Sequence, residues 1–221
     1  MAEDLVERSV HRGVSFRAVV ADSFYGEDRE FKHSLGELEV GCVLALKKSH
    51  AWWHLEGTIG ALWQAAQAAG WKGAQEPGDW TKVMRAFRDG HQEEWWALEV
   101  EAGPYGKARA KRALVVSPDP EELPDLPIWY LTTNLPAPGS EQAPEERETE
   151  GALAPASVAG VVRLFGMRTW VEQSYKQVKH ALGGSDLALP VKERPRDSSP
   201  LAVGVLGVLV LLVGIWALAD R

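Results

Sequence analysis

The sequence predicts an α/β protein in which helices alternate with buried strands of a sheet. Two short segments, Phe16–Ala21 and Gly41–Leu46, are apolar on both faces, which is typical of strands covered on both sides in a parallel sheet. A helical pattern at Asp28–Glu39 separates them, as a crossover helix separates parallel neighbours. The 221 residues, 45% hydrophobic and 25% charged, suffice for a core and exclude wholesale disorder.

The other elements follow from the periodicity of the apolar residues. Before the first strand, Ala2–Arg12 is expected to form a helix. The Trp-rich segment Trp52–Gly90 has a mixed pattern that predicts no single element. After it we expect three strands and one long helix, at Trp95–Val100, Arg112–Ser117, Ile128–Thr133 and Ala156–Leu182.

Two polar segments interrupt this alternation and are expected to be exposed. Pro136–Pro155 contains four prolines and five glutamates against one arginine, so it cannot bury enough apolar area to order itself. Ser185–Pro200 is rich in proline, serine and charged residues, and we interpret it as a linker.

A strongly apolar run, Leu201–Ala219, follows this linker. Its 19 residues carry no charge, and a helix of this length would measure about 28 Å, close to the roughly 30 Å of a bilayer core. We therefore expect an apolar C-terminal helix that could anchor the protein in a membrane. Lys192, Arg194 and Arg196 would keep the preceding body in the cytoplasm. A buried core helix and a tail that is not native to the fold are the alternatives.

Charge and cysteine content narrow the classes of function. A net charge of −7 argues against a uniformly basic protein that coats nucleic acid, but it leaves room for a local basic cleft. The single cysteine, Cys42, excludes an intramolecular disulfide framework and a Cys-based zinc site. It lies in a predicted buried strand, so we expect it to act as inert packing.

Three smaller features each admit two interpretations. The basic run Lys107–Arg112 could bind phosphates or form a solvated turn. The pairs Trp52-Trp53 and Trp95-Trp96 could stack on bases, but tryptophan more often packs in a core. His50 and His54 are spaced like metal ligands but lack further ligands nearby, so we expect a structural role.

Asp22 stands at a position where a functional carboxylate is expected. It follows the strand Phe16–Ala21 directly and precedes the sequence SFYG. In open α/β sheets, ligands bind at the carboxyl ends of the strands, so an aspartate here would point into a candidate site. The alternative is that Asp22 caps a turn or the helix that begins near Asp28.

The long helix Ala156–Leu182 carries a second carboxylate. At about 100° per residue, Arg168, Glu172 and Lys179 lie within about 40° of one another beside an apolar stripe. Glu172 is therefore expected at the edge of the buried face between two cations, where a residue that lines a cleft would be. The alternative is a solvated ladder of ion pairs, each contributing only about 0.3–0.5 kcal/mol.

Together, these two features resemble the DDE transposases of the insertion-sequence-four superfamily. The spacing Phe165-x2-Arg168-x3-Glu172-x6-Lys179 matches its Tyr-x2-Arg-x3-Glu-x6-Lys pattern, with phenylalanine in place of tyrosine. The segment VVADSFYGEDREF, residues 19–31, is similar to its second-Asp motif, in which a strand is followed by Asp, Tyr-Gly and a helix. The segments most resemble the insertion-sequence 701 group, and the resemblance covers roughly residues 1–183.

The resemblance implies a ribonuclease H-like catalytic core with a β-rich or mixed insertion, and the cleavage and transfer of DNA strands. Two Mg²⁺ (or Mn²⁺) ions held by an Asp-Asp-Glu triad would activate a water or a 3′-hydroxyl and stabilise the leaving oxygen. Asp22 would be the second metal-binding carboxylate of the triad and Glu172 the third. The residues that would bind DNA are Arg168, Lys179, Tyr25 and Lys176.

The first Asp of the triad has no counterpart in this sequence. In the family it lies on the first strand of the fold, whereas here a single helix and a single strand occupy the residues before Asp22. The resemblance therefore implies an incomplete core whose first strands are missing, and a chain that is inactive by itself. Beyond Gly184 the family's helical and basic sequence is replaced by the linker and the apolar run, which a change of reading frame would explain.

The expected organisation has six parts. They are a partial core (1–50), an insertion (51–135), an acidic loop (136–155), the helix with Glu172 (156–183), a linker (184–200) and a candidate transmembrane helix (201–219). Expected partners are transposon ends and target DNA, a second copy or a full-length transposase, and a membrane through Leu201–Ala219. The expected location is the cytoplasm, at the nucleoid, or a membrane. A non-catalytic fragment that binds DNA or a transposase, and a membrane-anchored remnant of the fold, are the alternative functions.

Overall fold

A computed structural model describes residues 2–53, 59–100, 112–123, 128–140 and 153–181, except for the side chains of residues 53 and 171–181. Its centre is a six-stranded mixed sheet with the order β1-β2-β8-β7-β6-β5. The protein is therefore mixed α/β, as the sequence predicts.

One end of the sheet is a parallel pair. β1 (Val19–Ala21) lies beside β2 (Cys42–Leu46), with Val20 opposite Val43. All three residues of β1 are buried, which confirms the prediction of parallel neighbours that are apolar on both faces. The predicted strand Phe16–Ala21 is too long, because strand geometry begins only at Val19.

The connection between these two strands contains two helices: the predicted helix at Asp28–Glu39 is confirmed, and a short helix that was not predicted precedes it. The two helices are α2 (Ser23–Glu27) and α3 (Arg29–Glu37). The Asp22 carboxylate accepts a backbone hydrogen bond at the start of α2, and the Asp28 carboxylate accepts two at the start of α3. Each aspartate therefore caps its own helix, and the second cap divides the segment.

The other four strands of the sheet are antiparallel. β8 (Trp129–Thr133) pairs with β2, and β7 (Arg112–Ser117), β6 (Gln92–Val100) and β5 (Thr81–Ala86) follow in turn. These strands come from the segment predicted as an insertion, yet they continue the same sheet as β1 and β2. The remaining short elements are β3 (Ala51–Trp53), β4 (Ile59–Ala61), α4 (Leu62–Ala69) and the 3-10 helix η1 (Pro120–Glu122).

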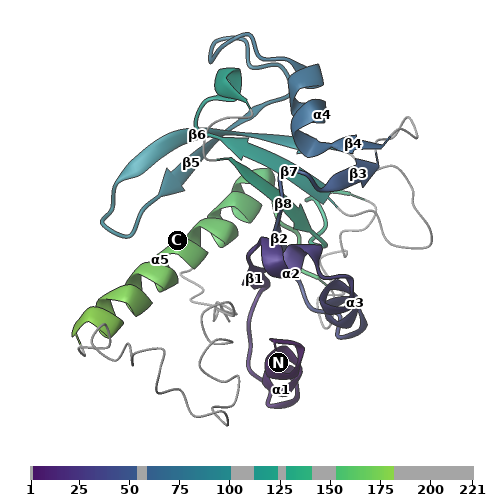
Figure 1. The fold of residues 1–221 in the computed structure, drawn as a ribbon, viewed down its shortest axis with the longest axis vertical. Helices are drawn as coiled ribbons and strands as arrows, with labels where there is room; N and C mark the ends of the chain where they lie inside the picture. The colour runs from purple at the N-terminus through teal and green to yellow at the C-terminus, as the bar shows by residue number, and fades with distance from the viewer. Residues whose placement is uncertain (1, 54–58, 101–111, 124–127, 141–152, 182–221) are drawn as a thin grey trace, which may run out of the picture.

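Helices cover both faces of the sheet (Figure 1). The long helix α5 (Val158–Ala181) packs on one face through residues such as Val161 and Phe165. On the other face, α1 (Ala2–His11) and α3 cover the β1–β2 end. On that same face, α4 and β3 cover β6, β7 and β8. The predictions of a first helix and a long last helix are therefore confirmed.

The tryptophans of β6 pack in these two layers. Trp95 lies in the core beneath α5 and Trp96 in the core beside α4, because successive side chains of a strand point to opposite faces. Both are buried, as is Trp52 in β3. For these three residues packing is confirmed and base stacking is wrong. Cys42 is also buried, as predicted.

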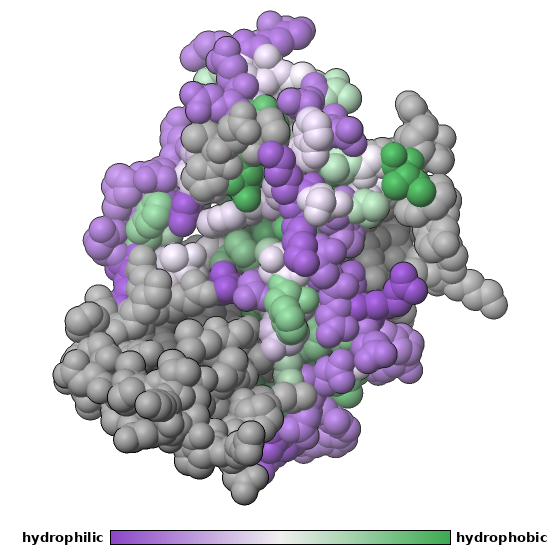
Figure 2. All heavy atoms as spheres, viewed as in Figure 1, coloured by the Kyte–Doolittle hydropathy of each residue, from purple (hydrophilic) through white to green (hydrophobic). Residues whose placement is uncertain are grey.

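Among the residues coloured in Figure 2, hydrophilic ones are the most widespread, with apolar residues scattered among them. Within the described residues, no helix is long and apolar enough to cross a membrane. The predicted linker and the apolar run Leu201–Ala219 lie outside those residues, as does the acidic segment 141–152.

Candidate functional site

The candidate site lies at the carboxyl edge of the parallel pair. Asp22 follows β1 directly and Lys47 follows β2, and parallel strands bring their carboxyl ends to the same edge of a sheet. Helix α2 packs against β2 so closely that a Cβ on Gly26 would lie 1.7 Å from the carbonyl oxygen of Ala45. Only glycine fits at this position, which gives the Tyr-Gly step of the motif a physical reason.

Asp22 connects the two sequence motifs. Its Oδ1 accepts a hydrogen bond from the Phe24 amide at 3.0 Å, and its Oδ2 lies 3.5 Å from Nη2 of Arg168 in α5. The Asp22 side chain is 31% exposed and that of Arg168 is 21% exposed. The structure therefore brings together two predicted site residues that are far apart in the sequence. Asp22 also caps a helix, so both interpretations of this residue hold.

Tyr25 lies beside this pair, on α2. Its ring packs against Phe31, with the ring centroids 5.0 Å apart. Burial, together with the negative charges of Asp22 and Asp28, raises the pKa of the Tyr25 phenol above its ordinary value. The hydroxyl consequently stays protonated at neutral pH, so it can donate a hydrogen bond to a phosphate oxygen.

Phe165 occupies the tyrosine position of the second motif, and it belongs to the core. Its side chain is 5% exposed and packs edge-on against Trp129, with the centroids 5.0 Å apart. It lies on the face of α5 that packs on the sheet, among apolar side chains. A phenylalanine here therefore helps to hold the helix on the sheet.

The remaining predicted site residues, Glu172, Lys176 and Lys179, lie on the last turns of α5. Their side chains are outside the described part of the structure. The backbone of α5 is helical from Val158 to Ala181, so Glu172 follows Arg168 by about one helical turn. The helix thus keeps the predicted spacing, and the roles of these three residues stay predictions.

α5 is held on the opposite side by the edge strand β5. The indole Nε1 of Trp170 donates a hydrogen bond of 3.3 Å to the carbonyl of Ala86. The guanidinium of Arg85 lies 4.4 Å from the ring centroid of Trp95 and 4.6 Å from that of Trp129. Burial lowers the pKa of Arg85, and the charge of Glu93 opposes this shift. These contacts were not predicted, because the segment that contains them has no clear periodicity.

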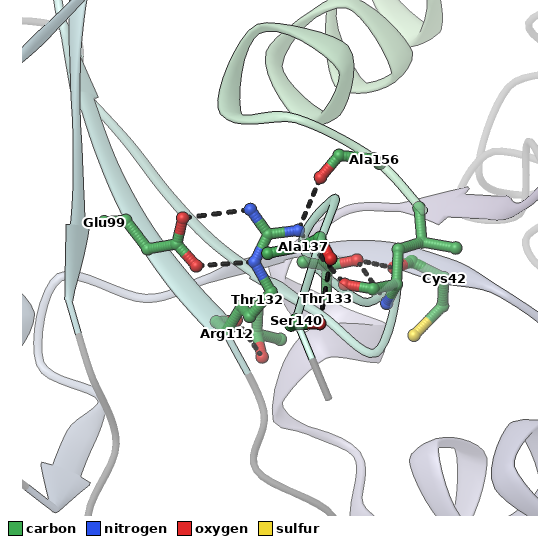
Figure 3. Close-up of polar contacts among 9 residues, drawn as sticks. Cys42, Glu99, Arg112, Thr132, Thr133, Ala137, Ser140 and Ala156 are labelled. Carbon is green, nitrogen blue, oxygen red and sulfur yellow. Dashed lines mark hydrogen bonds and ion pairs between the residues drawn. The ribbon is translucent and has the colours of Figure 1, made fainter. Parts of the chain in front are cut away.

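Arg112 is the last residue of the basic run Lys107–Arg112, and its contacts contradict a phosphate-binding role for this residue. Its guanidinium forms a two-pronged pair with Glu99 on β6 and donates to the carbonyls of Leu135 and Ala156 at 3.1 and 2.6 Å (Figure 3). The side chain is only 12% exposed. Arg112 therefore ties β7 to β6 and to the chain on both sides of the acidic loop. The other residues of the run lie outside the described ranges.

A second unpredicted contact joins α2 to the turn after β2. The Glu27 carboxylate accepts a hydrogen bond from the Lys47 amide at 2.9 Å, and its other oxygen lies 2.9 Å from Nδ1 of His50. Burial alone would raise the pKa of Glu27, but the contacts with Lys47 and His50 outweigh it and hold the pKa below its ordinary value. A glutamate directly after the Tyr-Gly step was the only signal for this contact in the sequence.

The chemistry of Asp22 suits a magnesium ion, since Mg²⁺ prefers hard carboxylate oxygens and keeps several waters. The carboxylate is partly exposed at a strand end. Among the described residues, however, no group of three or more His, Cys, Asp or Glu side chains could hold a metal. Asp22 therefore fits as one ligand, and a complete metal site requires residues beyond those described.

Comparison with known proteins points in the same direction as the motifs. Over 190 residues, the chain is 30% identical to a protein of Microchaete diplosiphon described as a probable transposase for insertion sequence element IS701. No family model and no solved structure matches the chain. The match covers 86% of this chain but only 40% of the relative. The similarity therefore supports a transposase family for a chain that spans two fifths of that relative's length.

Proposed function

We propose that this chain is part of the catalytic domain of a DDE-type insertion-sequence transposase with a ribonuclease H-like fold. The observation that carries the proposal is the ion pair of 3.5 Å between Asp22 and Arg168. It unites the strand-end aspartate with the helix that bears Glu172, as the resemblance requires. The mixed sheet, with a buried parallel pair next to α5, is compatible with that fold.

In this proposal Asp22 and Glu172 are two of three carboxylates that hold Mg²⁺ or Mn²⁺. The bound metal would activate a water or a 3′-hydroxyl and stabilise the leaving oxygen. Arg168, Lys176 and Lys179 would contact DNA phosphates by charge, and the protonated hydroxyl of Tyr25 would donate a hydrogen bond. The partner is DNA, and the location is the cytoplasm.

Asp22 and Glu172 supply two of the three carboxylates, and no counterpart of the first Asp is identified in residues 1–221. We therefore propose that the chain binds DNA but does not cleave it when tested alone. Incubation with supercoiled plasmid and Mg²⁺ or Mn²⁺ tests this, and we expect no nicking. Nicking that Asp22→Ala or Glu172→Ala abolishes would contradict the proposed inactivity and establish the chemistry.

DNA binding and metal binding are tested separately. Fluorescence anisotropy with labelled duplex DNA should show binding that weakens as salt rises. Electron paramagnetic resonance of free Mn²⁺ should show that Asp22→Asn and Glu172→Gln each weaken Mn²⁺ binding at least several-fold. Asp4→Asn, a change to an exposed carboxylate on α1, is the matched control and should have no effect. A chain that binds no DNA at any salt concentration would refute the proposed function.

A further inference from the structure

The turn between β2 and β3 lies at the same sheet edge as Asp22. Ala21 of β1 is level with Leu44 of β2, so Asp22 is level with Ala45, two residues before Lys47. Two residues of strand measure about 7 Å. The turn is closed by a hydrogen bond of 2.9 Å from the His50 amide to the Lys47 carbonyl. A duplex whose phosphate lies at Asp22 would therefore have its neighbouring phosphates within reach of this turn.

Glu27 holds both ends of this turn in place. One of its carboxylate oxygens accepts the Lys47 amide and the other contacts the His50 ring. The side chains of His50 and Glu27 are only 21% and 28% exposed. The backbone of the turn is thus ordered before any ligand arrives, which lowers the entropic cost of binding.

The charge of the turn is available at the surface. Lys47 and Lys48 are exposed, and neither forms an ion pair with any residue in the part of the chain that the structure describes. Other exposed lysines, Lys72 and Lys82, are paired with Glu76 and Glu94. Lys47 and Lys48 thus have no carboxylate partner among these residues, and they lie in an ordered turn at the edge of the candidate site. Their positive charge therefore complements that of a polyanion.

We propose that the turn Lys47–His50 binds the phosphate backbone of DNA, next to the DNA strand that is held at Asp22 and Arg168. Lys47 and Lys48 supply the phosphate contacts, and Glu27 is a positioning residue that fixes the turn. Such contacts set the register of the duplex and carry no sequence preference. This inference rests on the proposed function, because it assumes that DNA is bound at the sheet edge.

The salt dependence of DNA binding tests the inference, because each phosphate contact contributes about 0.9 to the slope of log affinity against log salt. The double variant Lys47→Gln/Lys48→Gln should lower this slope by about 2 and weaken binding at least tenfold at moderate salt. The matched control is Lys72→Gln/Lys82→Gln, which changes the net charge equally but removes lysines that are already paired. Its slope should equal that of the unaltered chain.

A third variant, Lys47→Arg/Lys48→Arg, should keep the full slope because it keeps both charges. Thermal melting of all three double variants should match that of the unaltered chain, since the lysines are exposed. Equal slopes for the Lys47/Lys48 and Lys72/Lys82 glutamine variants, with DNA still bound, would overturn the inference and leave the proposed function intact. Failure of the unaltered chain to bind DNA would overturn both.

Discussion

At the scale of single residues, Gly26 shows how tightly α2 is seated on β2. Because a Cβ there would overlap the Ala45 carbonyl, Gly26→Ala should force the helix away from the strand. We expect a loss of about 2 kcal/mol or more in the free energy of unfolding, measured by urea denaturation. Gly36→Ala in α3 is the matched control, because its Cβ would meet no atom within 4 Å. The control should gain about 0.5–1 kcal/mol, and equal effects of the two changes would refute the close packing.

Glu27 makes stability depend on pH. Its pKa in the folded protein lies below the ordinary value of 4.5, so its ionised form favours folding. This contribution is complete above about pH 5.5 and is lost as pH falls through 4.5 and then through the folded pKa. The difference in unfolding free energy between the unaltered chain and Glu27→Gln should therefore shrink from pH 7 to pH 3. The exposed control Glu37→Gln should change the unfolding free energy by less than about 0.5 kcal/mol.

At the scale of elements, α5 is held between the two edges of the sheet. Arg168 contacts Asp22 after β1, and Trp170 donates to Ala86 at the end of β5. Arg168 and Trp170 are separated by one residue, so both contacts act on the same turn of the helix. Glu172 lies immediately beyond this turn, and its position relative to Asp22 therefore depends on both ends of the sheet.

Arg112 connects elements in the same way. Arg112→Lys would remove the two-pronged pair with Glu99 and leave carbonyls of Leu135 and Ala156 without their donor. Because the pair is largely buried, we expect a loss of about 3 kcal/mol in unfolding free energy, measured in urea. Arg29→Lys, on the exposed start of α3, should change stability by less than about 0.5 kcal/mol. A similarly small effect of Arg112→Lys would show that the carbonyl contacts contribute little.

At the scale of the whole molecule, β1 is an edge strand. Among the described strands it pairs only with β2, and the edge of a sheet is a template for pairing with another chain. We expect the protein to self-associate, so that its sedimentation coefficient rises with concentration. A single monomeric species over a hundredfold range of concentration would contradict this expectation.

Most of the elements and part of the site could be predicted because they depend on local pattern. The two β1–β2 strands are apolar on both faces, and the segment that becomes α5 shows a helical pattern with a buried stripe. Asp22 was predicted at a strand end because the strand before it was recognised. The short helix α2 was missed, although a capping role was one of the two interpretations of Asp22.

The sequence by itself determined that the protein is α/β and that two strands are parallel neighbours, and it showed that the segments around Asp22 and Glu172 resemble two motifs of one family. Only the tertiary structure decided that Asp22 meets Arg168, that Arg112 is an internal tie, and that Glu27 fixes the turn after β2. The physical reason is range. Periodicity and capping act within a few residues. These contacts instead join residues that are separated by whole strands, and they depend on the order of the strands in the sheet.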